Sequence, residues 1–203
     1  MEEYMIWFTA DLHFGHAGVR VHQDARFQET RDLADMDAML IGAVNYWVQP
    51  NDTLYHLGDF CWQASRAGHY RARLKVRELH FIRGNHDASS LRRHGSSLND
   101  LLYRRFTVAT AHGNTDRIRI RMSHEPMLSW RGMQKGSIHL YGHSHGKFEE
   151  KLDSLWPNRR AMDVGIDNIH RLIGRWRPIS IDEVYARLMH RPLEERHEHA
   201  NAS

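Results

Sequence analysis

The chain of 203 residues is 41% hydrophobic and 26% charged, and its formal net charge is +3. This composition is typical of a globular protein with a sizeable core, and the charge is too small by itself to indicate a nucleic-acid-binding protein. The single cysteine, Cys61, excludes an intramolecular disulfide and a four-cysteine zinc site.

In chain order, the first half of the sequence predicts three buried strands and two helices. Strands are expected where short apolar runs end in glycine or polar residues, and helices where apolar residues recur every three or four positions. The strands are residues 5–10, 53–58 and 78–84, and the helices are residues 32–48, followed by Pro50, and residues 64–76.

The second half predicts further strands and a closing helix. Residues 91–103 are expected to be partly helical, and a helix is expected at residues 181–189, after Pro178. Strands are expected at residues 106–112 and 118–123, joined by a turn at 113–116, and at residues 137–142 and 161–166. Arginines alternate with apolar residues from Arg117 to Met122. This alternation predicts a strand with one buried face and with arginines exposed to solvent on the other.

These elements together predict an α/β fold built of layers, with functional residues on loops after the strand ends. We expect one domain over residues 1–189 and a polar, disordered tail over residues 190–203. The apolar run 5–10 is too short for a secretory signal and no run could cross a bilayer, so we expect a cytoplasmic protein without a membrane partner. The sequence leaves the oligomeric state open.

A short motif near residue 143 suggests a metal site. Residues 141–146 read YGHSHG. His143 and His145 are two positions apart, so on an extended backbone both side chains point to the same side. The glycines beside them allow a sharp turn and a close approach of the backbone to a ligand.

Four other predicted strands end in metal-binding residue types. The candidate ligands from all five clusters are Asp11, His13, Asp59, Asn85, His124, His143 and His145. Carboxylate, amide and imidazole ligands suit borderline or hard divalent ions of the first transition row. Seven ligands are too many for one tetrahedral ion and suit two ions that share a carboxylate.

The five clusters read DLH, GDF, GNHD, SHEP and GHSH, and in this order they resemble the five motifs of the calcineurin-like metallophosphoesterases. The resemblance extends from Asp11 to His145. It implies a central two-sheet β-sandwich flanked by helices, with a dinuclear metal centre at the strand ends.

The resemblance also implies a role for each motif residue. Asp11, His13 and His145 would hold the first metal, Asp59 would bridge both metals, and Asn85, His124 and His143 would hold the second. His86 would be the general acid, and Asp87 would orient its ring. The two divalent ions would be manganese as the first choice, with iron, nickel, cobalt or zinc as alternatives.

The implied function is metal-dependent hydrolysis of phosphoesters, in which a metal-bridged hydroxide attacks phosphorus and His86 protonates the leaving group. We expect a phosphodiesterase for small nucleotide-like substrates, because the segment between Asp87 and His124 is too short for a large cap domain. Its arginines would bind phosphate: Arg92, Arg93, Arg104 and Arg105. A phosphomonoesterase is the first alternative, and a non-catalytic metal-bound scaffold is an alternative from another class.

A nuclease is a further alternative, and it requires a basic groove with aromatic residues. The candidate segment for that groove contains Trp156, Arg159, Arg160, Arg171, Arg175, Trp176 and Arg177, although tryptophans in the core are the commoner explanation. Nucleic acid is therefore an open partner in addition to the small phosphoester.

Several residues outside the five clusters have two interpretations. His56, His80 and His139 lie within apolar runs and are expected to be core or sheet histidines. His16, just past the first motif, either lies near the site or has a structural role. Cys61 and Trp62 either line the site or pack in the core.

Overall fold

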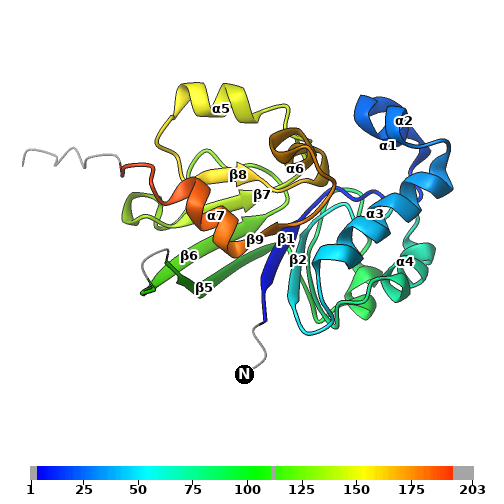
Figure 1. Ribbon diagram of the computed structural model, residues 1–203, viewed down its shortest axis with the longest axis horizontal. Coiled ribbons are helices and arrows are strands. Elements are labelled where there is room, and N and C mark those ends of the chain that lie inside the picture. The colour runs from blue at the N-terminus through cyan, green and yellow to red at the C-terminus, as the bar shows by residue number, and fades with distance from the viewer. Residues whose placement is uncertain (1–3, 111–112, 194–203) are drawn as a thin grey trace, which may run out of the picture.

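The computed structural model of the protein describes residues 4–110 and 113–193, which form two β-sheets and the helices around them (Figure 1). The first sheet contains β1 (Ile6–Thr9), β2 (Thr53–Leu57), β3 (Glu78–Ile82), β4 (Ser97–Asn99) and β9 (Ile179–Ser180), in the order β4-β3-β2-β1-β9. Strands β1 to β4 are parallel, and β9 is antiparallel to β1.

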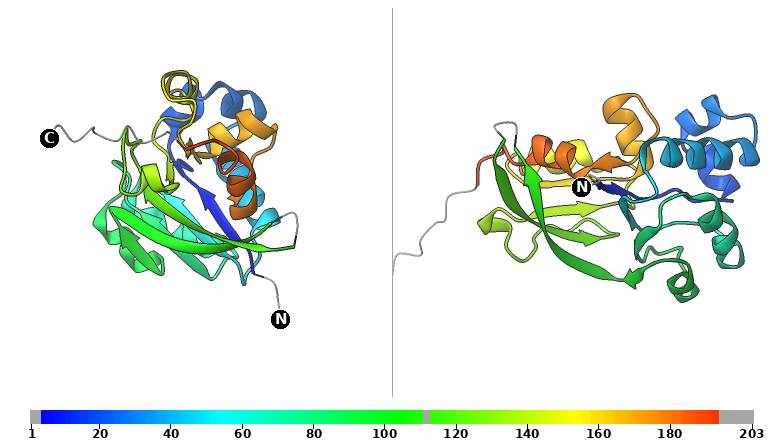
Figure 2. Two further views of the ribbon diagram at one scale, coloured as in Figure 1. Left: turned by 90° about the vertical axis from the view of Figure 1, so that its left-hand side faces the viewer. Right: turned by 60° about the horizontal axis from the view of Figure 1, so that its bottom comes forward.

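The second sheet has the order β5-β6-β7-β8 and consists of β5 (Leu101–Ala109), β6 (Thr115–Ser123), β7 (Ile138–Tyr141) and β8 (Ala161–Asp163). Strand β5 is antiparallel to β6, whereas β6, β7 and β8 are parallel. Both sheets are thus mixed. The two views of Figure 2 show the long β5–β6 ribbon curving along one side of the molecule.

Apolar side chains fill the space between the two sheets and also cover the other face of the first sheet. In β1, Phe8 belongs to the core between the sheets, while Trp7 belongs to the core under the helices, because successive residues of a strand point to opposite faces. In β6, Ile118, Ile120 and Met122 are buried between the sheets. The predicted two-sheet sandwich flanked by helices is therefore confirmed.

The helices lie around this sandwich. They are α1 (Ala17–His22), α2 (Asp24–Glu29), α3 (Leu33–Trp47), α4 (Ala67–Arg73), α5 (Glu149–Leu155), α6 (Ile166–Ile173) and α7 (Ile181–Leu188), with short 3₁₀ helices η1 (Ala64–Arg66), η2 (Ser89–His94) and η3 (Met133–Lys135). Helix α3 begins where the Asp32 side chain accepts a hydrogen bond from the Asp35 amide, and it packs Met36, Leu40 and Val44 on the first sheet.

The predicted elements agree with the structure except between residues 91 and 103. Only the start of that segment is helical, in η2, whereas Ser97–Asn99 and the residues from Leu101 onward form β4 and β5. The prediction of a partly helical segment is thus met only up to His94, and β4 was missed because it is three residues long and is defined by its pairing with β3 rather than by its own pattern. Helices α1, α2, α5 and α6 and strand β9 were not predicted.

The end of the predicted domain is visible only in part. Residues 194–203 of the predicted tail, and residues 111–112 of a predicted strand, lie outside the described residues. Before that point, Arg191 pairs with Asp153 at 3.2 Å. The division at residue 189 therefore stays a prediction.

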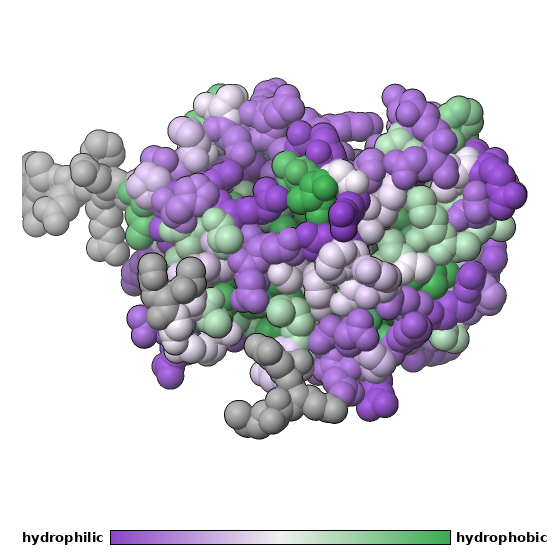
Figure 3. Space-filling model, in the orientation of Figure 1, coloured by the Kyte–Doolittle hydropathy of each residue, from purple (hydrophilic) through white to green (hydrophobic). Residues whose placement is uncertain are grey.

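The surface in Figure 3 is dominated by hydrophilic residues, with apolar ones scattered among them. Within residues 4–110 and 113–193, helices are too short or too polar to cross a membrane.

Candidate metal centre

The parallel strands of both sheets bring the predicted site residues to one edge of the sandwich. The residues lie in the loops after these strands: Asp11 and His13 after β1, Asp59 after β2, Asn85, His86 and Asp87 after β3, His124 after β6, and His143 and His145 after β7. Loops at the carboxyl ends of parallel strands are the usual place for ligand sites in such folds.

The backbone at this edge is strained. Five non-glycine residues in the described part of the chain have a positive φ, between 48° and 68°, and all five are predicted metal ligands. They are Asp11, His13, Asp59, His143 and His145. Residues other than glycine disfavour this left-handed conformation. Such strained residues are found most often at functional sites, where the surrounding structure enforces the conformation.

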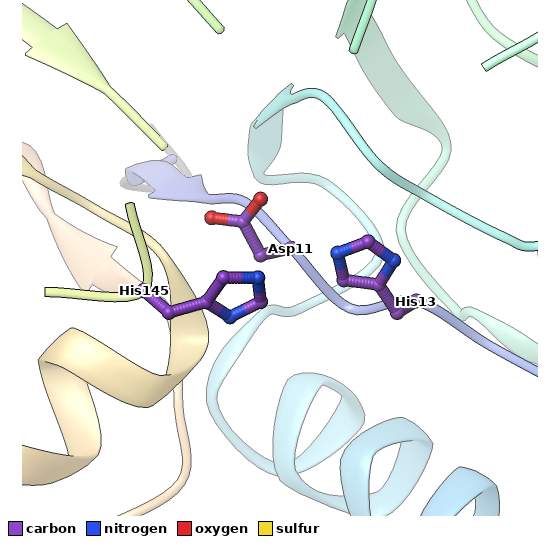
Figure 4. A group of neighbouring side chains, drawn as sticks. All are labelled: Asp11, His13 and His145. Atoms are coloured by element: carbon purple, nitrogen blue, oxygen red, sulfur yellow. The ribbon is translucent and has the colours of Figure 1, made fainter. Parts of the chain in front are cut away.

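Asp11, His13 and His145 form the first group of side chains that could hold a metal ion (Figure 4). Asp11 is fully buried, and its carboxylate accepts hydrogen bonds from the His143 amide. The ring nitrogens of His13 are buried and have no hydrogen-bond partner within the described residues. Because buried polar atoms are normally paired, these nitrogens fit a bound ion.

A buried chain of contacts orients His145. Its Nδ1 donates to Asp167 Oδ2 at 2.6 Å, which leaves Nε2 to face the first group. Asp167 is in turn bound at both carboxylate oxygens by the buried Arg26, at 2.7 and 2.8 Å. Arg26 also donates to the carbonyls of Asp11 and Leu12. Sequence analysis missed Arg26 and Asp167, which are 141 positions apart.

The second group contains Asp59, His124 and His143, with Asn85 beside them. His124 Nε2 lies 3.0 Å from Asn85 Oδ1, 3.3 Å from His143 Nδ1 and 3.3 Å from Asp59 Oδ2. His124 Nδ1 donates to the Leu57 carbonyl at 2.8 Å, which fixes the ring so that Nε2 points into this group.

Asp59 lies between the two groups. Its Oδ2 is 3.4 Å from His13 Nε2 of the first group and 3.3 Å from His124 Nε2 of the second. Atoms that bind one ion at about 2.1 Å lie about 3.0–4.2 Å from one another. These separations therefore fit ligands of two neighbouring ions that share the Asp59 carboxylate.

The pKa values of the ligand candidates also fit a buried cation site. Burial raises the pKa of Asp11 to about 7 and lowers the pKa of His13 to about 2. Burial would lower the pKa of His124 too, but the hydrogen bond with Asp59 and the negative charges of Asp11 and Asp59 together outweigh burial and raise that pKa to about 9. A divalent cation would stabilise the carboxylates and replace the proton of His124.

The Asp87 carboxylate joins the loops that follow β2 and β3. It accepts hydrogen bonds from the amides of Asp59, Phe60 and Gly84, at 2.7, 3.0 and 3.0 Å. Within the described chain, no hydrogen bond joins Asp87 to the His86 ring. Asp87 therefore fixes the loops after β2 and β3 to each other, because amides from both need an acceptor, and its role in orienting His86 stays a prediction.

His86, His16 and Trp62 form one wall beside the first group. The His86 amide donates to Asp59 Oδ1 at 2.9 Å, and the exposed His86 ring lies 5.5 Å from the His13 ring. His16 stacks on Trp62 with ring centroids 3.9 Å apart and lies 5.4 Å from the His13 ring. His16 and Trp62 therefore lie near the site, which was one of the interpretations left open for each.

Other residues that the sequence singled out have structural contacts. His56 and His139 are fully buried, as predicted for core histidines. Burial raises the pKa of the Cys61 thiol to about 12, and Cys61 packs in the core under the helices. In the predicted basic segment, Arg159 is buried and paired with Glu149 at 2.9 Å, and Arg177 is paired with Glu183. These two arginines of the segment are therefore held by carboxylates of the protein itself.

Comparison with known proteins agrees with the motif pattern. Residues 6–157 match the family model of the calcineurin-like phosphoesterase superfamily domain. The chain belongs to this superfamily. Family membership supports a metal-dependent hydrolase that acts on phosphoesters, and it confirms the resemblance drawn from the five motifs.

Relatives of this calcineurin-like phosphoesterase include two phage proteins. The Gene 66 protein of Mycobacterium phage L5 is 30% identical, with 93% of this chain and 96% of the relative covered. The Gene 66 protein of Mycobacterium phage D29 is 27% identical, with 83% and 90% covered. The crystal structure of AQ665, a protein of unknown function from Aquifex aeolicus, matches with a TM-score of 0.64 at 20% identity. The match covers 91% of this chain and 99% of that chain, so the two proteins share the fold.

Proposed function

We propose that this calcineurin-like phosphoesterase is a dinuclear metal-dependent phosphodiesterase for small nucleotide-like substrates. The observation that carries the proposal is the position of Asp59 Oδ2, 3.4 Å from His13 and 3.3 Å from His124, because one carboxylate can then serve two ions. Asp11, His13 and His145 would hold one ion, and Asn85, His124 and His143 the other. Bound divalent ions supply Lewis-acid stabilisation of phosphoryl charge and lower the pKa of water.

The protein's own residues would position the substrate and move a proton. The His86 ring is exposed beside the first group, and within the described residues its nitrogens form no hydrogen bond, so they are free to contact a phosphoryl or leaving-group oxygen. An imidazole within reach of the leaving-group oxygen can serve as a general acid. Trp62 would limit the movement of this ring, since their centroids lie 5.1 Å apart.

The openness of the site supports a diester. A cavity of about 360 Å³ lies beside the second group and includes Arg83, Asn85, His124 and Met127 in its lining. Its volume lies in the range of small-ligand pockets. Asn85 and His86 are exposed, which leaves room for substituents on both sides of a phosphorus atom. A closed pocket for a terminal phosphate would favour a monoester instead.

The test is hydrolysis of bis-p-nitrophenyl phosphate by chelator-stripped protein, with manganese, iron, nickel, cobalt, zinc or magnesium added back. We expect metal-dependent turnover that Asp59→Asn abolishes, with manganese as the best ion, and a lower rate for p-nitrophenyl phosphate. A preference for the monoester at saturating metal would contradict the diesterase. Two bound ions without turnover of either ester would contradict the enzyme and favour a metal-bound scaffold.

A further inference from the structure

A strongly basic cavity lies on the outer face of the second sheet, apart from the metal ligands. Its volume is about 540 Å³, and its lining includes Arg105, Arg119, Arg121, Arg131 and Lys135. No aspartate or glutamate is among the described residues that line it. Within the described chain, these five cations also have no carboxylate within 4.0 Å, whereas Arg26, Arg159 and Arg177 are each paired.

Two arginines in this cavity face each other at a cost in stability. Arg105 of β5 and Arg119 of β6 are direct cross-strand partners, and both point away from the core between the sheets. Like charges directly opposite each other on one face of a sheet are destabilising. An anion between the two guanidinium groups would remove this cost, and arginine binds phosphate oxygens through two hydrogen bonds.

Neighbouring residues shape the cavity around these cations. Arg119 donates to the carbonyl of Lys135, which holds the loop with η3 against β6. The next cross-strand pair is Tyr103 and Arg121, whose guanidinium carbon lies 5.9 Å from the tyrosine ring centroid. The Arg121 Nε atom is buried and has no hydrogen-bond partner within the described residues. The cavity therefore combines cationic groups that are unpaired within the described chain with a half-buried aromatic ring at one side.

The cavity is aligned with the metal centre along one strand. His124 directly follows β6, and Arg121 and Arg119 lie three and five residues before it on the same strand. At about 3.4 Å per residue, these separations are about 10 and 17 Å. Phosphates of one nucleic-acid strand are about 3.4 Å apart along a duplex axis and farther apart when extended, so this distance corresponds to about two to five nucleotides.

We propose that the basic cavity binds phosphates of a single-stranded oligonucleotide two to five nucleotides from the phosphate at the metal centre. The inference rests on the proposed phosphodiesterase activity for the place of the reacting phosphate. It extends the proposed substrate from a small nucleotide-like diester to a single-stranded oligonucleotide. A flexible single strand can enter a cavity of this shape, and Tyr103 offers its ring to a base. The two neighbouring cavities would then hold one continuous chain.

The first test measures binding without catalysis. A fluorescently labelled six-nucleotide single-stranded DNA is titrated with the full-length protein in chelator, from 50 to 200 mM salt. We expect Arg105→Ser/Arg119→Ser to weaken binding about tenfold and to make the slope of log affinity against log salt shallower by about 1.4, since each lost phosphate contact removes about 0.7. The variant removes a repulsive pair but also the hydrogen bond from Arg119 to the Lys135 carbonyl, so thermal unfolding checks that it folds like the parent.

The matched control is Arg73→Ser/Lys75→Ser, which removes two exposed charges near the end of α4. It has the same change of net charge and should bind like the parent. Equal weakening by both double variants would show attraction by overall charge and overturn the inference, as would parental binding by Arg105→Ser/Arg119→Ser. Tripolyphosphate that binds as tightly as the oligonucleotide, and depends on the same arginines, would overturn the polynucleotide assignment.

A second test links the cavity to the reaction. With metal added, kcat/KM for the oligonucleotide relative to bis-p-nitrophenyl phosphate should fall about tenfold in Arg105→Ser/Arg119→Ser, because the small ester cannot reach the cavity. An unchanged ratio with weakened binding would overturn the alignment with the metal centre. Absence of turnover in the parent would contradict the proposed function alone, since the binding readout does not depend on it.

Discussion

At the scale of single residues, the site combines strained ligands with a free histidine. Glycine would relieve the left-handed backbone at Asp11, Asp59 or His143, but glycine has no ligand atom. The strain is maintained because hydrogen bonds hold these loops, such as those that the Asp59 and Phe60 amides donate to the Asp87 carboxylate. His86 differs, because its ring is exposed and its amide alone is anchored.

This free ring predicts a dependence on the leaving group. His86→Asn should lower kcat about 10²- to 10⁴-fold for a diester with an alkyl leaving group, because the departing alkoxide needs a proton. The loss should be much smaller for bis-p-nitrophenyl phosphate, whose leaving group is stable as an anion. Steady-state kinetics on both esters check this, with His22→Asn, an exposed histidine of α1, as the control. Equal losses on both esters would indicate positioning rather than proton transfer.

The contact between Asp167 and His145 predicts an effect on metal affinity. Asp167→Asn keeps the volume but loses the charge that holds the Nδ1 proton of His145, so affinity for the metal should fall about 10- to 100-fold. The variant also leaves the buried Arg26 without its anion, so the free energy of unfolding should fall by about 3 kcal/mol.

Isothermal titration with manganese and chemical denaturation separate these two effects. Asp153→Asn is the control, because Asp153 is paired with Arg159 and Arg191 away from the metal ligands. Its metal affinity should equal that of the parent. A stability loss without a change in metal affinity for Asp167→Asn would show that Asp167 has a structural role only.

At the scale of elements, the site depends on close contact between the loops after β2 and β3. Gly84 lies against Asp59, and a Cβ atom at Gly84 would be 2.1 Å from Asp59 Oδ1 and 2.3 Å from its amide nitrogen. Both contacts are far below any allowed separation. The loop that carries Asn85 could not approach the loop that carries Asp59 if residue 84 had a side chain.

Gly84→Ala should therefore abolish metal-dependent turnover while the sheets still form. Gly42→Ala is the matched control, because Gly42 lies within α3 and a Cβ atom there would meet nothing within 4 Å. The control should keep full activity and gain up to about 1 kcal/mol in the free energy of unfolding. Turnover assays and thermal unfolding check both variants, and an active Gly84→Ala protein would contradict the required loop contact.

The elements also show what the sequence could predict. Strands β1, β2, β3 and β7 and helix α3 were predicted because each has a local apolar pattern of its own. Helices α1 and α2 have six residues each, too few to show a period, and β4 and β9 are defined by pairing with distant strands. The predicted ligands follow strands directly, whereas Arg26 and Asp167 act through a contact across 141 positions that no local pattern indicates.

At the scale of the whole molecule, the first sheet is buried on both faces, and this places a histidine in the core. His56 of β2 lies on the helix-covered face between Phe60 and Phe81, with ring centroids 5.2 and 5.9 Å away. It is fully buried, and within residues 4–110 and 113–193 its ring nitrogens have no hydrogen-bond partner. Burial lowers the pKa of His56 from 6.5 to about 3.

This buried ring predicts that acid weakens the whole fold. Between pH 6.5 and about 3, the unfolded chain binds a proton at His56 that the folded chain does not, so stability is present above pH 6.5 and falls as the pH decreases. At about 1.4 kcal/mol per pH unit, His56 should account for about 2 kcal/mol of the loss in the free energy of unfolding between pH 7 and pH 5.

Urea denaturation of the metal-free parent and His56→Leu proteins at both pH values measures this loss. The control is His69→Ala, which changes an exposed histidine of α4. The pH-dependent loss should shrink by about 2 kcal/mol in His56→Leu alone, since leucine fills the same apolar site without a proton to bind. An unchanged loss in that variant would show that other groups cause the acid sensitivity.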